Sequence, residues 1–355
     1  MTGAAFARAL RGLATLEVPS CAGERTLAIA GVRLRVRLSS PRLAAGALRA
    51  LAHHALTSAP ASPYDATVLL LDHDVPGNPV HEILPAVRSA PPVADRIERW
   101  SYESDAGRGL LHEGFRTLFL WDRGQRRAAV WLGEDGALPY HLVALPLLPV
   151  LSWVLAEQGR SVIHAAAVAT ESGAVLIGGR SGTGKSTAAL ACLDAGLGFL
   201  GDDMCIVEPG TRPVVHSLYC SGKLDAPDTA RFPALAPARV EGSGPWWEKS
   251  VYLFDGHLAD RMVRSAALAG VAIPRRDDGP PARLSARQAF LAMAPNTAFQ
   301  LPGAAQAAIA GVREVVSRVP VHSVGVGDGI GAIAGRLADF ARGLACGSAH
   351  PELRT

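Results

Sequence analysis

The residues with the clearest chemical potential form a glycine-rich loop, Gly179-Arg-Ser-Gly-Thr-Gly-Lys185-Ser186. The loop fits G-x-x-x-x-G-K-[ST] at every fixed position, and an apolar segment precedes it while an alanine-rich segment follows. Glycines let the backbone curl so that N–H groups point at phosphate oxygens, and a following helix adds its dipole. The lysine reaches the β- and γ-phosphates of a nucleotide, and the serine hydroxyl ligates Mg²⁺. We therefore expect ATP to be bound by Gly179, Arg180, Ser181, Gly182, Thr183, Gly184, Lys185, Ser186 and Thr187.

An acid pair, Asp202–Asp203, follows an apolar stretch and a glycine. Phosphoryl transfer needs a carboxylate that holds the metal and usually a group that activates the nucleophile. A parallel βαβ unit brings the strand after the loop helix back beside Lys185, so both acids are expected near the phosphates. Neighbouring strand residues point to opposite sides, so both reach the site only if the strand bends or ends there. Other acids after apolar triplets are weaker candidates: Asp72, Asp122 and Asp255.

Further candidates are single residues. His164 lies in the segment SVIHAAAVAT, and on its spacing alone it is typical of a core histidine bonded to the backbone. Cations that would support a phosphate are Lys223, Lys249 and Arg275, although each is more typical of an ordinary surface charge, and Arg276 is weaker still. The pair Trp246–Trp247 fits a substrate platform or a hydrophobic anchor for its loop equally well.

The composition limits the class of protein. A chain of 355 residues with 49% apolar and 19% charged residues has enough material for two folded domains. Its net charge of +3 comes from 35 basic and 32 acidic residues without a block of like charge, so nucleic acid is not an expected partner. Five scattered cysteines, an odd number, argue against a disulfide framework and favour a reducing cytoplasm.

Membrane insertion and secretion are not expected. The N-terminus has scattered arginines but no long apolar stretch before a small-residue cleavage site. The most apolar run, Leu142–Leu155, is too short to span a bilayer and contains Pro146 and Pro149.

The spacing of apolar and turn residues predicts an α/β fold, α+β overall, in which residues 1–150 form an N-terminal α+β domain. A second domain, which contains the glycine-rich loop, follows over 151–346, with a frayed tail over 347–355. The expected strands are Leu27–Val36, Asp65–Leu71, an antiparallel meander over 97–132, Ser161–Thr170, Ala174–Gly178, Phe199–Val207 and Pro320–Gly325. The expected helices are Arg42–His54, Leu142–Gln158, Ser186–Ala195 and Ile330–Leu344, and loops that could act as lids are Val240–Lys249 and Arg275–Pro281.

Taken together, His164, the loop Gly179–Ser186 and Asp202–Asp203 resemble the HPr kinase/phosphorylase family, whose members carry an isolated strand histidine, a hairpin, a serine-containing P-loop and an Asp-Asp pair in this order. ATP-type phosphoenolpyruvate carboxykinase shares the arrangement. The resemblance covers Ser161–Glu208 closely and continues more weakly to about residue 330. Within the family the chain is most similar to the HPr kinase-like serine kinases found beside ribosomal peptide clusters, including those of lasso peptides. Some of these phosphorylate a precursor peptide on its C-terminal serine.

The resemblance implies roles for individual residues. Lys185 and Ser186 would hold nucleotide and Mg²⁺, Asp202 would be the general base and Asp203 the metal-linked acid, although these two roles are interchangeable at this stage. His164 would lie near the transferred phosphate. Relatives form oligomers, so a homo-oligomer is compatible with the resemblance. Residues 1–150 do not resemble the N-terminal domain of true HPr kinases, and the phosphorylase-associated signature is not found after the acid pair.

Three hypotheses about function remain open on the sequence. The leading one is an ATP- and Mg²⁺-dependent kinase that phosphorylates a serine hydroxyl of a peptide or small protein. The second is a kinase of a free small molecule such as serine. The third is a regulatory ATPase or switch without an acceptor, which usually needs a water-orienting residue and a sensor that are not evident here. Neither a preference between ATP and GTP nor the acceptor is legible in the residues.

Overall fold

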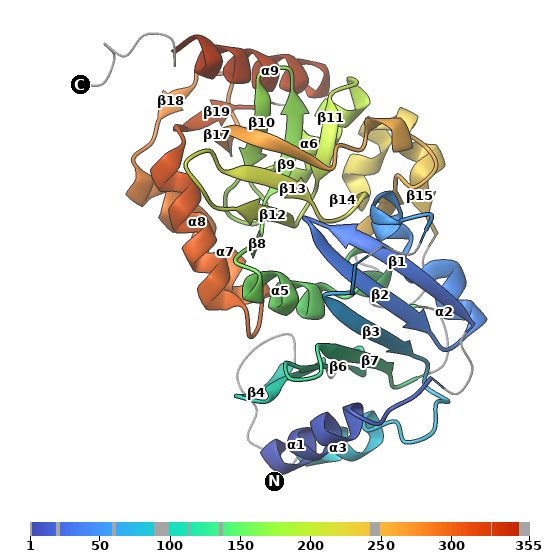
Figure 1. The fold of residues 1–355 in the computed structure, drawn as a ribbon. Coiled ribbons are helices and arrows are strands. Elements are labelled where there is room, and N and C mark those ends of the chain that lie inside the picture. Colours follow the sequence, from blue (N-terminus) through green and yellow to red (C-terminus); the bar gives the residue numbers. More distant parts are fainter. Residues whose placement is uncertain are drawn as a thin grey trace. The chain divides into compact units, whose positions relative to one another are not determined.

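The computed structural model describes residues 2–18, 22–58, 62–88, 99–112, 114–134, 138–241, 249–327 and 329–347 (Figure 1). Two compact units divide the chain: the first consists of Met1–Leu48 and His54–Val154, and the second of Arg49–His53 and Leu155–Thr355. The expected α/β fold class, α+β overall, is confirmed. Trp246, Trp247 and the expected tail from residue 348 lie outside the described residues.

In the described residues, the first unit contains one mixed sheet of order β1-β2-β3-β7-β6-β5-β4. Its strands are β1 (Gly23–Ile29), β2 (Val32–Leu38), β3 (Ala66–Leu71), β4 (Arg99–Ser104), β5 (Gly107–His112), β6 (Thr117–Asp122) and β7 (Arg127–Leu132). The expected antiparallel meander corresponds to β4–β7. Strand β3 pairs in parallel with both β2 and β7, so the meander joins the N-terminal hairpin through β3.

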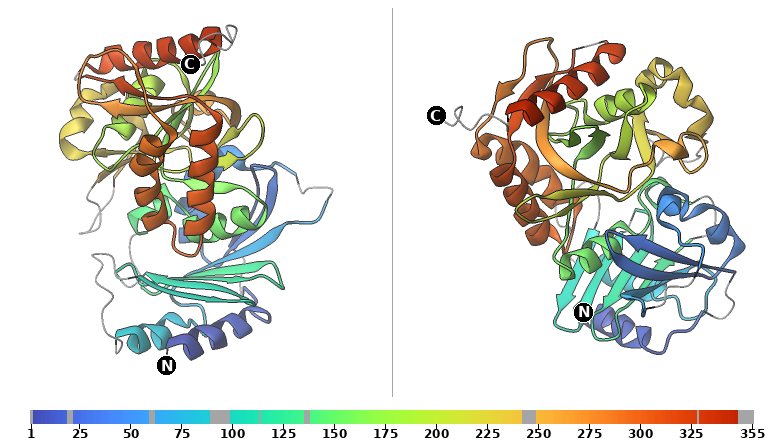
Figure 2. Two further views of the ribbon diagram at one scale, coloured as in Figure 1. Left: turned by 90° about the vertical axis from the view of Figure 1, so that its left-hand side faces the viewer. Right: turned by 45° about the horizontal axis from the view of Figure 1, so that its top comes forward.

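Two helices cover one face of this sheet. The helices α1 (Thr2–Leu13) and α3 (Val80–Arg88) lie side by side on it in Figure 2. Phe6 and Leu10 of α1 and Ile83 of α3 pack in one core cluster with Leu69 and Trp131 of the sheet. Strands β3, β6 and β7 are buried at nearly every position, which explains why their sequences are apolar runs and do not alternate.

Two predicted elements of the first unit are wrong in detail. The expected strand Leu27–Val36 is a hairpin, because Ala30 and Gly31 adopt φ values of 48° and 80°, the conformation of a tight primed turn. The expected helix Arg42–His54 is divided into α2 (Pro41–Gly46) and the 3₁₀ helix η1 (Arg49–His54). A glycine at the end of α2 is consistent with this stop, because glycine is a poor helix residue.

The second unit is built on a larger mixed sheet of order β11-β9-β10-β17-β13-β12-β8, with β19 and β18 continuing from β17. The strands are β8 (Ser161–Ile163), β9 (Ala166–Thr170), β10 (Gly173–Ile177), β11 (Gly198–Gly201), β12 (Cys205–Glu208), β13 (Val214–Ser217), β17 (Ser265–Arg275), β18 (Ala282–Arg283) and β19 (Val321–Gly325). Helices α6 (Lys185–Asp194) and α9 (Ile330–Gly347) pack in one core cluster with the sheet. Helices α7 (Ala286–Gln300) and α8 (Ala305–Arg318) belong to the other cluster, so the sheet lies between two helical layers.

A small second sheet of order β14-β16-β15 follows β13 in the chain. Its strands are β14 (Ser221–Asp225), β15 (Arg239–Val240) and β16 (Lys249–Leu253), and the 3₁₀ helices η2 (Ala226–Arg231), η3 (Pro233–Ala238) and η4 (Ala259–Arg261) accompany them. Gly222 of β14 lies so close to Leu190 of α6 that a Cβ atom would meet its methyl group at 2.8 Å. The small sheet is thereby fixed beside the helix that follows the phosphate loop.

Several expected long elements are broken. The expected strand Ser161–Thr170 is β8 and β9, and the expected strand Phe199–Val207 is β11 and β12. The expected helix Leu142–Gln158 is α4 (Tyr140–Ala144) and α5 (Leu148–Glu157), because Pro146 disfavours helical backbone at the preceding Leu145, where α4 ends. No helix within the described ranges combines the length and the apolar character that crossing a membrane requires.

The second unit includes a short segment from early in the chain. Arg49 forms a two-pronged ion pair with Asp255, with Nε–Oδ2 and Nη2–Oδ1 distances of 2.8 Å. The carbonyl of Ala50 accepts the backbone N–H of Cys220 at 2.8 Å. Residues 49–53 therefore complete the second unit although they interrupt the first.

Candidate phosphate-loop site

The glycine-rich loop connects β10 to α6, as the sequence predicts. Gly182 and Gly184 have φ values of 78° and 93°, which a side chain would strain. Helix α6 begins at Lys185, and the buried ammonium group of this residue donates to the carbonyls of Gly179 (3.2 Å) and Arg180 (3.0 Å). The lysine is thus folded over the loop, with its charge where phosphates would be bound.

The electrostatics of Lys185 reflect this burial. Desolvation lowers the pKa of its ammonium group, the carboxylates of Asp203 and Asp202 act to raise it, and the charge of Lys249 lowers it further. Lys249, which forms an ion pair with Asp225 at 3.2 Å, is therefore within electrostatic reach of the loop. Two acids and a second lysine surround the loop lysine, as a site for a polyanion and a metal requires.

One arginine contacts the glycine-rich loop although the sequence does not single it out. Arg276, which follows β17, donates from Nη2 to the carbonyl oxygen of Gly182 at 3.1 Å. Arg275 instead contacts its own loop, donating to the carbonyl of Pro280 at 3.1 Å and pairing with Asp277 at 3.2 Å. Of the two neighbouring arginines, the structure brings Arg276 to the phosphate loop, and no local sequence signal distinguishes it from Arg275.

The acid pair lies in a strained turn. Strand β11 ends at Gly201, and the backbone N–H of Met204 donates to the carbonyl of Asp202 at 2.8 Å, closing a three-residue turn. Asp203, at the centre of this turn, has a φ of 70°. Non-glycine residues with such backbone angles are uncommon and are often found at functional sites. This turn supplies the bend that neighbouring strand residues need if both acids are to face one site.

The carboxylate of Asp202 is buried, with only 1% of the residue exposed. Its Oδ2 atom accepts the backbone N–H of Lys223 at 3.1 Å, while Oδ1 has no hydrogen-bond partner among the described residues. Burial and the neighbouring charge of Asp203 raise the pKa of Asp202 to about 6, although Lys223 and the hydroxyl of Ser186 act in the opposite direction. The hydroxyl of the loop serine therefore lies within hydrogen-bonding reach of this buried carboxylate.

The pKa of Asp203 is shifted in the opposite direction. Burial would raise the pKa of its carboxyl, but the charge of Lys223, the imidazole of His164 and a hydrogen bond from Lys223 outweigh burial and lower this pKa to about 2. The ammonium group of Lys223 forms an ion pair with its Oδ2 atom. Lys223 thus contacts both acids, one through its backbone and one through its side chain, and of the three weaker cation candidates it is the one placed against them.

His164 lies in the break between β8 and β9. Its backbone N–H donates to Oγ1 of the buried Thr297 at 3.2 Å, and its Nδ1 atom lies 3.3 Å from Oδ1 of Asp203. Burial lowers the pKa of the imidazole to about 4, with the charges of Lys185 and Lys223 adding to this effect and Asp203 opposing it. The ring is therefore neutral near neutral pH, and it faces the acid pair rather than an apolar core.

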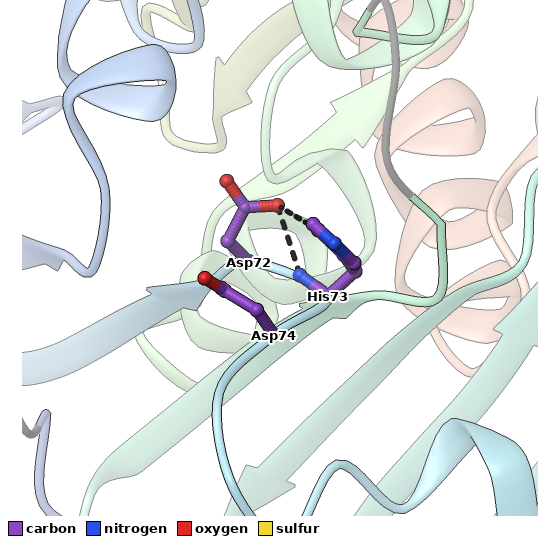
Figure 3. A group of neighbouring side chains, drawn as sticks. All are labelled: Asp72, His73 and Asp74. Atoms are coloured by element: carbon purple, nitrogen blue, oxygen red, sulfur yellow. Dashed lines mark hydrogen bonds and ion pairs between the residues drawn. The ribbon is translucent and has the colours of Figure 1, made fainter.

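The other acids after apolar triplets lie elsewhere. Asp72, at the end of β3, is grouped with His73 and Asp74 in the first unit (Figure 3). Its carboxylate already accepts hydrogen bonds from Ser40 (2.6 Å), Arg42 and the backbone of His73 (2.8 Å). Although burial opposes it, these donors lower the pKa of Asp72. The group is thus explained as a structural anchor between β3 and α2.

Comparisons with known proteins give little further support. No protein-family model matches the chain, and no curated protein matches it. Among solved structures, the chain is similar to the Hpr(Ser) kinase/phosphatase from Coxiella burnetii, with a TM-score of 0.31 and 12% identity over 54% of this chain and 99% of that chain. This similarity is too low to support an inference about function, so the chemistry of the site is inferred from the residues of this chain alone.

Proposed function

We propose that the protein is an ATP- and Mg²⁺-dependent kinase that transfers the γ-phosphate to a serine hydroxyl of a peptide or small protein. The observation that carries the proposal is the convergence of His164, Lys223 and the Asp202–Asp203 turn beside the phosphate loop. Phosphoryl transfer relies on positioned charges, and it needs a carboxylate near the incoming hydroxyl in addition to the one that holds the metal. A binding-only P-loop has no use for the second carboxylate and its two partners.

The nucleotide and metal would be held by the loop and the first acid. Backbone N–H groups of the loop and the start of α6 would bind the phosphates, and Lys185 would exchange its two carbonyl contacts for phosphate oxygens. The orphaned, buried Oδ1 atom of Asp202 and the neighbouring Ser186 hydroxyl fit a hard cation such as Mg²⁺. When bound there, the metal would offset the negative charge of the transferring phosphoryl group.

The two acids would then have different roles. The contact between Asp202 and Ser186 favours Asp202 as the metal-linked acid. Asp203, whose low pKa makes it a weak base, would then orient the serine hydroxyl by accepting its hydrogen bond. This order is the reverse of the one that the family resemblance first implies. His164 would orient Asp203 from one side, and Lys223, which neutralises Asp203, would help to stabilise negative charge that develops on the transferred phosphate.

The acceptor is proposed to be a polypeptide. The separate first unit, with a sheet and core of its own, supplies a surface larger than recognition of a metabolite needs. The resemblance to the kinases of lasso-peptide clusters leads to a finer proposal, namely that the acceptor is a precursor peptide phosphorylated on a C-terminal serine.

The test is to incubate the protein with Mg²⁺ and γ-labelled ATP, with serine-ended peptides or with free serine. Asp202→Asn and Asp203→Asn should abolish transfer, and Asp194→Asn, an exposed acid at the end of α6, should retain it. Label on a peptide supports the proposal. Label on free serine alone would instead identify a metabolite kinase, and phosphate release without any labelled acceptor would identify a regulatory ATPase.

A further inference from the structure

Arginines gather on one face of the sheet in the first unit. Strand β2 reads Val-Arg-Leu-Arg-Val-Arg-Leu, and its burial alternates so that the apolar residues are buried and Arg33, Arg35 and Arg37 are partly exposed. Alternate residues of a strand point to the same side. Because β2 lies between β1 and β3, this is an arginine row on the face of an interior strand, not on an edge.

The register extends the row across the sheet. Arg35 is opposite Thr26 of β1 and Thr67 of β3, and Thr67 is in turn opposite Arg127 of β7. Cross-strand partners share a face, so all of these side chains point to one side. This is the side on which α1 and α3 pack against Leu69 and Trp131, and the arginines of β2 remain partly exposed there. We call Arg33, Arg35, Arg37 and Arg127 the arginine strip.

Within the described residues the strip has fewer acids than arginines. Glu24 of β1 pairs with Arg35 at 2.9 Å and lies 3.9 Å from Arg37. Asp65 lies 3.8 Å from Arg33 and is shared with Arg126. Burial lowers the pKa of Arg127, the charge of Arg37 lowers it further and the charge of Glu17 opposes both, so Arg37 and Arg127 lie within electrostatic reach of each other. An anion placed on the strip would offset the repulsion between these like charges.

The arginines are partly held in place and partly unsatisfied. The guanidinium of Arg35 lies over the ring of Tyr64, 5.9 Å from its centroid. The Nε atoms of Arg33 and Arg37 are buried without a hydrogen-bond partner among the described residues, although their side chains are 35% and 29% exposed. Arg127 instead donates from Nη2 to the carbonyl of Leu16. A guanidinium presents donors in a rigid fork that matches a carboxylate, so the strip offers donors suited to carboxylates.

We propose that the arginine strip binds an acidic, extended segment of the polypeptide acceptor. Successive arginines of β2 are roughly 7 Å apart, the same repeat at which alternate side chains of an extended peptide occur. The strip therefore fits carboxylates at every second position. Glu24 and Asp65, which lie among the arginines, leave little net positive charge, so the strip suits a peptide with separated acids better than a nucleic-acid strand with a charge at every nucleotide. This inference rests on the proposed function only in naming the acceptor as the bound peptide.

The experiment measures binding without ATP, so that it does not depend on catalysis. A fluorescein-labelled peptide with glutamate at alternate positions and a terminal serine is titrated with the full chain by fluorescence anisotropy. The same peptide with glutamine in place of glutamate, and one with its glutamates contiguous, are the comparisons. The combined variant Arg33→Gln, Arg35→Gln, Arg37→Gln is matched with Arg212→Gln, Arg287→Gln, Arg313→Gln, which removes the same charge from exposed sites in the second unit.

We expect the strip variant to weaken binding of the alternating peptide by about tenfold or more, and the matched variant by less than about twofold. The wild-type protein should bind the glutamine peptide as weakly as the strip variant binds the alternating peptide. It should bind the peptide with contiguous glutamates less tightly than the alternating one. Equal losses in the two variants would show a general charge effect and overturn the proposal. Tighter binding of a single-stranded oligonucleotide, lost in the strip variant, would overturn it in favour of a nucleic-acid surface.

Activity separates this inference from the proposed function. In the kinase assay the strip variant should raise KM for the alternating peptide and leave kcat and KM for ATP unchanged. Failure to label any peptide, with peptide binding intact and strip-dependent, would contradict the kinase and leave the binding surface standing. Labelling with an unchanged KM in the strip variant would contradict the binding surface and leave the kinase standing.

Discussion

The Nδ1 atom of His164 lies 3.3 Å from Oδ1 of Asp203. Each residue is located where a predicted strand is interrupted, His164 between β8 and β9 and Asp203 between β11 and β12. Because the pKa of the imidazole is lowered to about 4, the contact joins a neutral ring to a charged carboxylate near neutral pH. This relationship makes the stability of the site sensitive to acid.

His164 should contribute a pH-dependent stability. Its pKa in the folded protein, about 4, lies below the ordinary value of 6.5, so the contribution is present above pH 6.5 and is lost as the pH falls toward 4. The difference corresponds to about 3 kcal/mol at most. Urea unfolding across this range should show a shallower pH dependence for His164→Gln than for the wild type. His257→Gln, at an exposed position, should retain the wild-type dependence, and an unchanged slope in His164→Gln would contradict the assignment.

Asp202→Asn should stabilise the nucleotide-free protein while abolishing transfer. The pKa of Asp202 is raised to about 6, so its favourable contribution exists at acid pH and is lost as the pH rises through 6. At pH 8 the buried carboxylate is charged and destabilising, and the neutral amide removes this cost. We expect Tm at pH 8 to rise by a few degrees in a thermal-shift measurement without Mg²⁺. Asp194→Asn is the control, and a lower Tm for Asp202→Asn would refute the prediction.

Lys223 and Asp203 should be strongly coupled. Removing one partner of a buried ion pair leaves the other charge uncompensated and typically costs about 3–5 kcal/mol. Lys223→Met and Asp203→Asn should therefore each lower the free energy of unfolding, and the double variant should lose much less than the sum of the two. Chemical denaturation of all four proteins measures the coupling. Strict additivity would mean that the ion pair does not form in solution.

Arg276→Ala should weaken ATP binding, because its guanidinium steadies the loop carbonyl of Gly182. A hydrogen bond of this kind contributes about 0.5–1.5 kcal/mol, so we expect an increase in Kd of roughly three- to tenfold. Arg275→Ala is the matched control, since the side chain of Arg275 contacts its own loop. Titration with a fluorescent ATP analogue compares the two variants. A larger effect at Arg275 would show that the loop rearranges when nucleotide binds.

The loop Gly179–Ser186 could be predicted from the sequence, because its glycines mark positions of positive φ and the apolar strand and alanine-rich helix on either side follow from local composition. The surroundings of the loop were less predictable. The apolar runs 161–170 and 199–207 each favour a single strand, and only long-range packing interrupts them at His164 and at Asp202–Asp203. At Asp203 the chain adopts a φ of 70°, which local preference disfavours for aspartate.

The sequence likewise does not show which basic residues lie at the site. Lys223, Lys249 and Arg275 are equivalent in a sequence, because each is a basic residue near a turn or strand. The pairing of β14 with β16, and the seat of Gly222 against Leu190, decide that Lys223 reaches the acids. The sequence favours Arg275 over Arg276 as a phosphate-site cation, yet Arg276 is the one that contacts Gly182. Such choices depend on register between distant strands, for which local sequence carries no signal.

Because the segment Arg49–His53 belongs to the unit with the phosphate loop, that unit is not a continuous stretch of chain that can be separated from the rest. A chain that begins at residue 155 lacks the guanidinium that pairs with Asp255 and the carbonyl that accepts the N–H of Cys220. A gene fusion that moved only the later residues to another protein would leave this insert behind. The two units are therefore expected to be inherited together, and the early part of the chain must already be present when the later part folds.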